Sequence, residues 1–252
     1  PHAKKPKRYG IIVSYSFGFC KCFQKFSNIY KKENSTMAIV TIVGAGMMGS
    51  ALAFPARENG NEVRLVGTHL DREIIETSIK TNRHPKFDTD FPAGLKYYQI
   101  EDVDVAIDGS DMIIGGVSSF GVDWFGDFVL PKIPLDTPVL SVTKGLFDLP
   151  DGSLLTYPEL WKRRLAEKGI NRSVNAIGGP CTSYELVAHD QTEVTFCGKD
   201  LSVLRMIKSA MATDYYHISL STDIVGVESA VLDHVGNAGA EFVKADGEFT
   251  RL

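Results

Sequence analysis

The chain has 252 residues, of which 44% are hydrophobic and 23% charged, a balance typical of a globular protein with a sizeable core. Charges or glycines interrupt every apolar run before the roughly 18 to 20 residues that a membrane helix needs, so we expect no membrane span. Its 4 cysteines are too few for a disulfide scaffold and lack the paired spacing of a zinc site. This cysteine usage favours a reducing, cytoplasmic compartment.

The charge is distributed unevenly along the chain. The net charge is -4 overall, yet residues 1–36 hold eight basic side chains against the single acid Glu33, which leaves residues 37–252 distinctly acidic. An acidic surface repels a phosphate backbone, so nucleic acid is not an expected partner. We interpret residues 1–36 as an N-terminal extension, either a targeting leader or a non-native segment ahead of a start at Met37.

From Met37 onward, short apolar runs alternate with longer amphipathic stretches, which is typical of a parallel α/β fold. A buried strand is predicted at 38–43, then a helix over 50–59, a second strand at 62–66 and a helix over 71–80 capped by Asp71. Further strands are predicted at 104–107, 112–114, 138–142, 174–177 and 193–196. The pattern therefore predicts a Rossmann-type, doubly wound, mostly parallel sheet spanning residues 37–220.

Three glycines lie between the first strand and the first helix. Gly44, Gly46 and Gly49 form a GxGxxG motif in the strand–turn–helix context of a dinucleotide site. The first glycine allows a tight turn, the second lets a pyrophosphate approach, and the third permits close packing of helix and strand. Met47 and Met48 are expected beside the dinucleotide at the helix start, or else in the core. The motif predicts NAD or NADP as cofactor.

The end of the second strand usually selects between these two cofactors, because an acid there binds the ribose hydroxyls and repels a 2'-phosphate. The sequence at this point offers Thr68 and His69 and no acid at the strand tip. Asp71 follows closely, although a helix cap is its expected role. We therefore predict that Thr68 and His69 contact the cofactor, and the choice between NAD and NADP stays open.

Six motifs in order carry a resemblance to a known family: VGAGMMGSALA at 43–53, NEVRLVGT at 61–68, GVSSFGV at 116–122, SVTKGL at 141–146, GGPCTSYELV at 178–187 and TDIVGVE at 222–228. From Met37 to about Glu228 the chain resembles the NAD(P)-dependent sn-glycerol-3-phosphate dehydrogenases, particularly their archaeal-like members. The resemblance implies hydride transfer between a nicotinamide and carbon 2 of a triose phosphate, which interconverts sn-glycerol 3-phosphate and dihydroxyacetone phosphate.

The resemblance also implies roles for single residues. Lys144 would contact both cofactor and substrate, and Gly179, Cys181 and Ser183 would line the substrate side. Ser118 and the serine after it replace a more usual proline–serine step and are interpreted as lining the cofactor site. No His–Asp pair accompanies Cys181, so a pocket wall is a better interpretation than a nucleophile. No histidine spacing suggests a metal site.

The resemblance fails near the end of the chain. The family carries a general acid/base lysine in a Leu-Lys-Asn-Val step, and here the corresponding step has Asp233 in place of that lysine, followed by His234. An aspartate cannot supply an ammonium, whereas His234 has a pKa suited to moving a proton. Residues 221–252 are interpreted as the start of a truncated or divergent helical domain. Loss of that domain would expose an apolar face and favour a homodimer or low solubility.

Three hypotheses follow. The first is a glycerol-3-phosphate dehydrogenase, the second is an inactive fragment that binds NAD(P) without turnover, and the third is a related dehydrogenase acting on 3-hydroxy acids, 6-phosphogluconate or ketopantoate. Asp233 favours the second hypothesis. The SVTKGL and GGPCTSYE steps argue against the third, because those relatives differ there.

Overall fold

The computed structural model describes residues 37–237, 242–243 and 249–250, so the predicted extension at 1–36 lies outside the described residues. Side chains are described as far as residue 230, which leaves those of Asp233 and His234 outside as well. Within the described ranges, no helix has both the length and the apolar character needed to cross a membrane.

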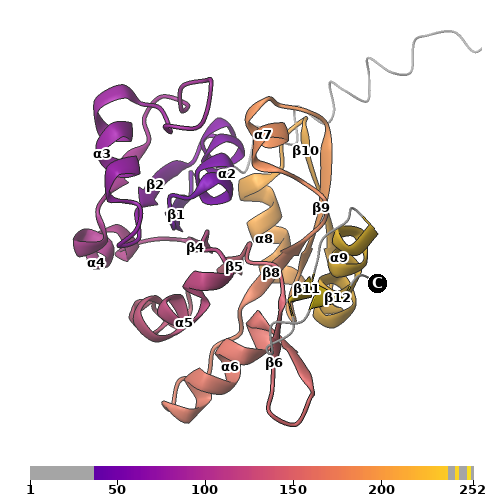
Figure 1. The fold of residues 1–252 in the computed structure, drawn as a ribbon. Coiled ribbons are helices and arrows are strands. Elements are labelled where there is room, and N and C mark those ends of the chain that lie inside the picture. The colour runs from indigo at the N-terminus through magenta and orange to yellow at the C-terminus, as the bar shows by residue number, and fades with distance from the viewer. Residues whose placement is uncertain (1–36, 238–241, 244–248, 251–252) are drawn as a thin grey trace, which may run out of the picture. The chain divides into compact units, whose positions relative to one another are not determined.

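The eight-stranded sheet confirms the predicted Rossmann-type fold (Figure 1). Neighbouring strands run parallel throughout, except that β8 and β9 pair in opposite directions. The strand order across the sheet is β10 (Tyr216–Ser221), β9 (Thr192–Cys197), β8 (Asn175–Gly178), β5 (Val139–Ser141), β4 (Met112–Gly115), β1 (Ile39–Val43), β2 (Glu62–Val66) and β3 (Lys96–Tyr98).

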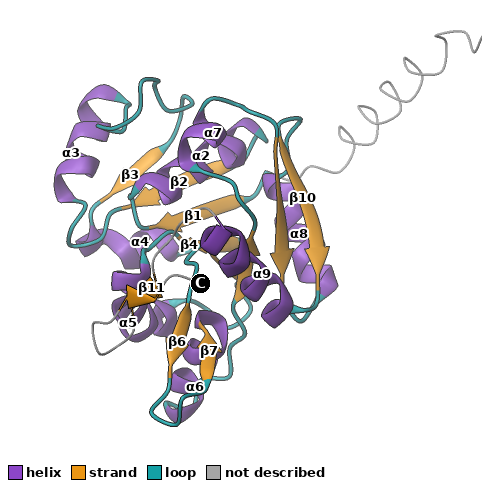
Figure 2. Cartoon of the chain, turned by 45° about the vertical axis from the view of Figure 1, so that its right-hand side comes forward, coloured by secondary structure: helices purple, strands orange, loops and turns teal. Residues whose placement is uncertain are grey.

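Helices cover both faces of the sheet, and two short hairpins accompany them (Figure 2). The helices are α2 (Met47–Glu58), α3 (Arg72–Thr81), α4 (Val103–Ile107), α5 (Val122–Trp124), α6 (Tyr157–Glu167), α7 (Ser183–Val187), α8 (Leu201–Met211) and α9 (Ile224–Asn237). Short 3-10 helices occupy Ile100–Asp102, Ser119–Gly121 and Leu130–Lys132, and a π-helical turn occupies Phe125–Val129. The hairpins pair β6 (Leu146–Asp148) with β7 (Leu154–Thr156) and β11 (Phe242–Val243) with β12 (Phe249–Thr250).

Two hydrophobic cores lie on opposite faces of the sheet, because successive strand residues point to opposite sides. Val40 and Ile42 of β1 belong to the core that α2 and α8 cover, whereas Val43 belongs to the core around Trp161 of α6. Thr41 points away from Val40 and Ile42, and its hydroxyl donates to the carbonyl of Ala106 at 2.8 Å. The central strands β1, β4, β5 and β8 are therefore buried on both sides.

The strand predicted at 104–107 is wrong, since this segment forms α4. Val103, Ala106 and Ile107 are buried and Val105 is exposed, which is the three-to-four-residue spacing of a helix rather than strand alternation. The first helix begins at Met47, three residues earlier than predicted. The edge strands β3 and β10 and the β6–β7 hairpin were not predicted.

Candidate functional site

The three glycines of the motif form the turn between β1 and α2, and their surroundings differ. Gly44 has a φ of +114°, and a Cβ there would lie 2.7 Å from the Gly116 carbonyl carbon. A Cβ on Gly49 would overlap the Gly44 carbonyl oxygen. Around Gly46, by contrast, a Cβ would meet nothing within 4 Å. The first and third glycines thus bring backbones together, and the second leaves space beside the turn.

A cavity of about 470 Å³ opens beside Gly46, at the carboxyl ends of β4, β5 and β8. Ligands of open α/β sheets bind at this edge. The cavity is lined by Gly46, Met47, Met48, Gly116, Val117, Ser118, Ser119, Val142, Thr143, Lys144, Ile177, Gly179, Cys181 and Val194. It therefore brings together residues from four of the six motifs in the sequence.

Lys144 follows β5 and reaches across the cavity towards the end of β8. Its ammonium donates a hydrogen bond to the Gly179 carbonyl oxygen at 2.5 Å. The pocket walls partly desolvate this ammonium and lower the pKa of Lys144, while the charges of Cys181 and Glu228 act in the opposite direction. Gly179 itself has a φ of +133°, a left-handed conformation that favours glycine at the position that accepts the bond.

Cys181 forms part of the cavity wall. Cys181 is 6% exposed, and burial raises the pKa of its thiol. A hydrogen bond with the Thr192 side chain lowers this pKa but does not cancel the effect of burial. A thiol with a raised pKa is a poor nucleophile at neutral pH. Its position agrees with the pocket-wall interpretation.

Asp71 occupies the N-cap position of α3, but its side chain makes no cap hydrogen bond. Instead, one carboxylate oxygen accepts from the Thr68 backbone N–H at 2.9 Å, the Thr68 hydroxyl at 2.8 Å and the Ala45 backbone N–H at 3.1 Å. The residue predicted to be a simple cap therefore ties the end of β2 to the glycine turn.

The remaining predicted residues lie outside the cavity lining. Gly44 and Gly49 pack beneath it, and Thr68 and His69 lie beyond β2, where the exposed His69 ring meets Trp124 edge-on at 5.8 Å. Ser183 is the first residue of α7 and does not line the cavity. The backbone of Asp233 forms part of α9, whereas its side chain is not among those that the structure describes.

Sequence reasoning missed two residues that the structure places at or next to this site. A Cβ on Gly116 would lie 2.8 Å from the Gly49 Cα, so this glycine completes the close approach of β4 to the turn. Glu228 is 3% exposed, and neither of its carboxylate oxygens has a hydrogen-bond partner among the described residues. The sequence could have indicated Gly116, since this glycine opens the GVSSFGV motif. The burial of Glu228 depends on tertiary packing that the sequence does not reveal.

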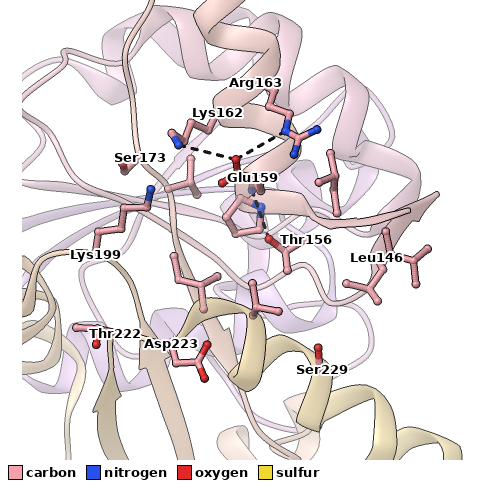
Figure 3. A pocket seen from close by; sticks show the side chains of 16 residues that line it. Leu146, Thr156, Glu159, Lys162, Arg163, Ser173, Lys199, Thr222, Asp223 and Ser229 are labelled. Carbon is pink, nitrogen blue, oxygen red and sulfur yellow. Dashed lines mark hydrogen bonds and ion pairs between the residues drawn. The ribbon is translucent and has the colours of Figure 1, made fainter. Parts of the chain in front are cut away.

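A second cavity, of about 530 Å³, lies between the β6–β7 hairpin, α6 and the start of α9 (Figure 3). Its basic side chains include Lys162 and Arg163, which lie 3.8 and 3.7 Å from the Glu159 carboxylate. None of the predicted site residues lines it. Across the described part of the chain, no group of three or more His, Cys, Asp or Glu side chains is arranged to hold a metal ion.

The parallel sheet, the glycine turn and the cavity at the strand ends define the Rossmann class of α/β fold. A family model described as the N-terminus of NAD-dependent glycerol-3-phosphate dehydrogenase matches residues 39–204. The chain therefore belongs to the NAD-dependent glycerol-3-phosphate dehydrogenase family, which it matches in the N-terminal domain.

Curated relatives agree with this assignment. The chain is 35% identical over 191 residues to the NADP(+)-dependent glycerol-3-phosphate dehydrogenase of Archaeoglobus fulgidus, a match covering 75% of this chain and 55% of the relative. It is 28% identical over 211 residues to the NAD(P)+ glycerol-3-phosphate dehydrogenase of Lactiplantibacillus plantarum, covering 81% and 60%. The chain thus spans little more than half the length of the curated relatives that it matches.

Solved structures share the fold. The glycerol-3-phosphate dehydrogenase of Coxiella burnetii superposes with a TM-score of 0.67 at 22% identity, covering 80% of this chain and 58% of that one. A ketopantoate reductase from Ralstonia eutropha gives a TM-score of 0.53 at 16% identity, covering 79% and 60%.

The glycine turn predicts a contrast between two substitutions. Gly49→Ala should lower the free energy of unfolding by about 2 kcal/mol or more, because its methyl group has to displace backbone. Gly46→Ala should cost about 1 kcal/mol or less, since its methyl enters open space and only the helix cap is weakened. Urea unfolding of both variants measures the difference, and equal losses would contradict the packing described here.

Glu228 predicts a pH dependence of stability. Burial raises the pKa of Glu228 to about 7, so the folded chain loses stability as the pH rises from about 4.5 through 7, where the unfolded state ionises first. Glu228→Gln cannot ionise and should gain roughly 3 kcal/mol relative to the parent between pH 4.5 and pH 8, at about 1.4 kcal/mol per pH unit.

Urea unfolding at these two pH values tests the Glu228 prediction. The exposed Glu76→Gln serves as the control, and its difference from the parent should stay small at both values. A Glu228→Gln difference that does not change with pH would show that the carboxyl titrates normally.

Proposed function

We propose that this chain binds a nicotinamide dinucleotide and interconverts sn-glycerol 3-phosphate and dihydroxyacetone phosphate. The observation that carries the proposal is the single cavity where the glycine turn meets Lys144, Gly179 and Cys181. Family membership and the names of the relatives support the same reaction class. Reduction of the ketone consumes one reduced cofactor and one proton, and the reverse reaction releases them.

The glycine turn fits a dinucleotide. The open space beside Gly46 is the room that a pyrophosphate needs to reach the backbone, and no side chain caps α2, so its first N–H groups remain available to phosphate oxygens. Gly44, Gly46, Met47, Met48 and Gly49 would hold this part of the cofactor. Ser118 would line the same side of the cavity. The bound nicotinamide would supply or accept the hydride.

Asp71 favours NADP over NAD. One of its carboxylate oxygens already accepts three hydrogen bonds from Thr68 and Ala45, which leaves this oxygen engaged with the protein rather than with a ribose hydroxyl. The buried Thr68 and the exposed His69 at the end of β2 would then meet the adenosine end without a free acid to repel a 2'-phosphate. The relative from Archaeoglobus fulgidus is named NADP(+)-dependent.

Lys144 is the cation that would neutralise the substrate phosphate and orient the ketone beside the cofactor. Its attachment to the Gly179 carbonyl holds the ammonium at the cavity wall, next to Cys181. Gly179 and Cys181 would shape the substrate side, and Ser183 would contribute from the start of α7. In this family the proton at the substrate oxygen comes from a lysine, and this chain has Asp233 at that step, followed by His234. This departure supports the alternative of a protein that binds NAD(P) without turnover.

The test of the proposal is oxidation of reduced nicotinamide by the purified chain with dihydroxyacetone phosphate. NADH and NADPH are supplied separately, and circular dichroism establishes that the protein is folded. We expect turnover, faster with NADPH, followed as loss of absorbance. Cofactor binding by a folded protein without any turnover would replace the dehydrogenase proposal with the binding-only alternative.

Gly46→Val tests the cofactor site directly. The branched side chain would fill the space that the pyrophosphate needs, so binding of NADPH, read by fluorescence titration, should be abolished. Gly46→Ala is the matched control and should retain part of the affinity, because its methyl group intrudes less. Unaltered binding in the valine variant would show that the dinucleotide lies elsewhere.

A further inference from the structure

The antiparallel pairing of β8 with β9 gives this sheet two groups of strand ends at which a ligand can bind. β4, β5 and β8 end at the cavity that Gly179 lines, whereas β9 and β10, which are parallel to each other, end at the other end of the sheet. The second cavity, of about 530 Å³, lies there: Lys199 follows β9, Thr222 follows β10 and Val174 precedes β8. Ligands of open α/β sheets bind outside the carboxyl ends of the strands, so this position favours a binding site.

Two ammonium groups meet in the second cavity. Lys162 of α6 and Lys199 of the turn between β9 and α8 both line it, and Figure 3 shows their side chains turned towards each other, with Ser173 on the same side of the cavity. Like charges repel each other, and an anion bound near both ammonium groups would offset that repulsion. The hydroxyl of Ser173 adds a donor from a third segment of the chain.

The acidic side chains of the same lining are engaged elsewhere. The Asp223 carboxylate accepts a hydrogen bond from the Gly226 backbone N–H at 2.8 Å, in the first turn of α9. The Glu159 carboxylate lies 3.8 Å from Lys162 Nζ and 3.7 Å from Arg163 Nε. No ion pair within 4 Å joins Lys199 to any residue that the structure describes. Its ammonium is therefore available to an anionic ligand.

The rest of the second cavity is largely apolar. Its apolar lining consists of Leu146, Leu154, Leu155, Pro158, Val174, Ile224 and Val225. Leu154 of β7 is 57% exposed and Val225 of α9 is 64% exposed, so the two walls present large apolar side chains to water. An apolar group bound along them would remove that surface from water, which is favourable. The cavity thus suits a ligand that has both an anionic group and an apolar part.

We propose that the second cavity binds a phosphate monoester that carries a short apolar chain. The phosphate would lie between Lys162 and Lys199 and accept from the Ser173 hydroxyl, and the chain would lie along Leu154 and Val225. Phosphate oxygens point in three directions and can accept from three separate segments, whereas the two oxygens of a carboxylate share one plane. None of the residues that line this cavity lines the one beside Gly46, so the inference goes beyond the proposed function and does not depend on it.

Isothermal titration calorimetry of the full chain with hexyl phosphate tests the proposal. We expect saturable binding of one molecule per chain. Hexanol, which lacks the charge, and hexylamine, which has the opposite charge, should give no saturable binding. Butyl phosphate should bind about tenfold more weakly than hexyl phosphate, because it buries two fewer methylene groups.

Two pairs of exposed substitutions locate the bound molecule. Lys199→Gln should lower the affinity for hexyl phosphate about tenfold, because it removes a charged donor, and Lys80→Gln on α3 is the matched control that should leave it unchanged. Leu154→Ser should lower the affinity about fivefold, and the equally exposed Leu135→Ser, outside the cavity, should not. Circular dichroism establishes that each variant is folded.

Lys144→Gln separates this site from the proposed cofactor and substrate site. The variant alters the cavity beside Gly46 and should leave the affinity for hexyl phosphate unchanged. Loss of hexyl phosphate binding in Lys144→Gln, with unaltered binding in Lys199→Gln, would place the ligand in that other cavity and overturn the proposal. Equal binding of hexyl phosphate and hexanol, or no saturable binding of hexyl phosphate, would overturn it as well. Failure of the chain to bind NADPH would leave it standing.

Discussion

The close approach of three glycine backbones is the constraint on which the rest of the site depends. Gly44, Gly49 and Gly116 bring the end of β1, the first turn of α2 and the end of β4 closer together than any side chain would allow. This approach sets where α2 begins, and so where its free N–H groups point. The same approach leaves Gly46 as the one motif glycine beside open space, so close packing and ligand access follow from one local geometry.

The other side of the cavity differs from the uncharged glycine turn because it carries the charged side chain of Lys144. There the Lys144 ammonium is partly desolvated although the residue is exposed, which lowers its pKa, and the Glu228 carboxyl is buried, which raises its pKa. The site thus combines a tightly packed, uncharged turn with a cation on the cavity wall.

The sequence predicted the central strands, the glycine turn and most of the cavity lining, because those features depend on local pattern. Strands β1, β4 and β5 are short, mostly apolar runs, as expected for strands of a sheet that is buried on both faces. The segment at 104–107 was misassigned because a five-residue helix is too short for its spacing to differ clearly from strand alternation. The roles of Asp71 and Glu228 could not be assigned from sequence, because the Ala45 N–H that donates to Asp71 lies 26 residues earlier in the chain and the burial of Glu228 depends on tertiary packing.

The antiparallel pairing of β8 with β9 shapes the cavity in a way that strand order alone does not convey. Because β9 runs against its neighbour, its early residue Val194 lies beside Gly179, where a parallel strand would have placed its carboxyl end. The crevice between strand ends is thereby bounded by the Val194 side chain of β9, the second strand from the edge of the sheet. Because Val194 lines the cavity beside Gly179, the volume of the side chain at position 194 limits the size of the molecule that the cavity admits.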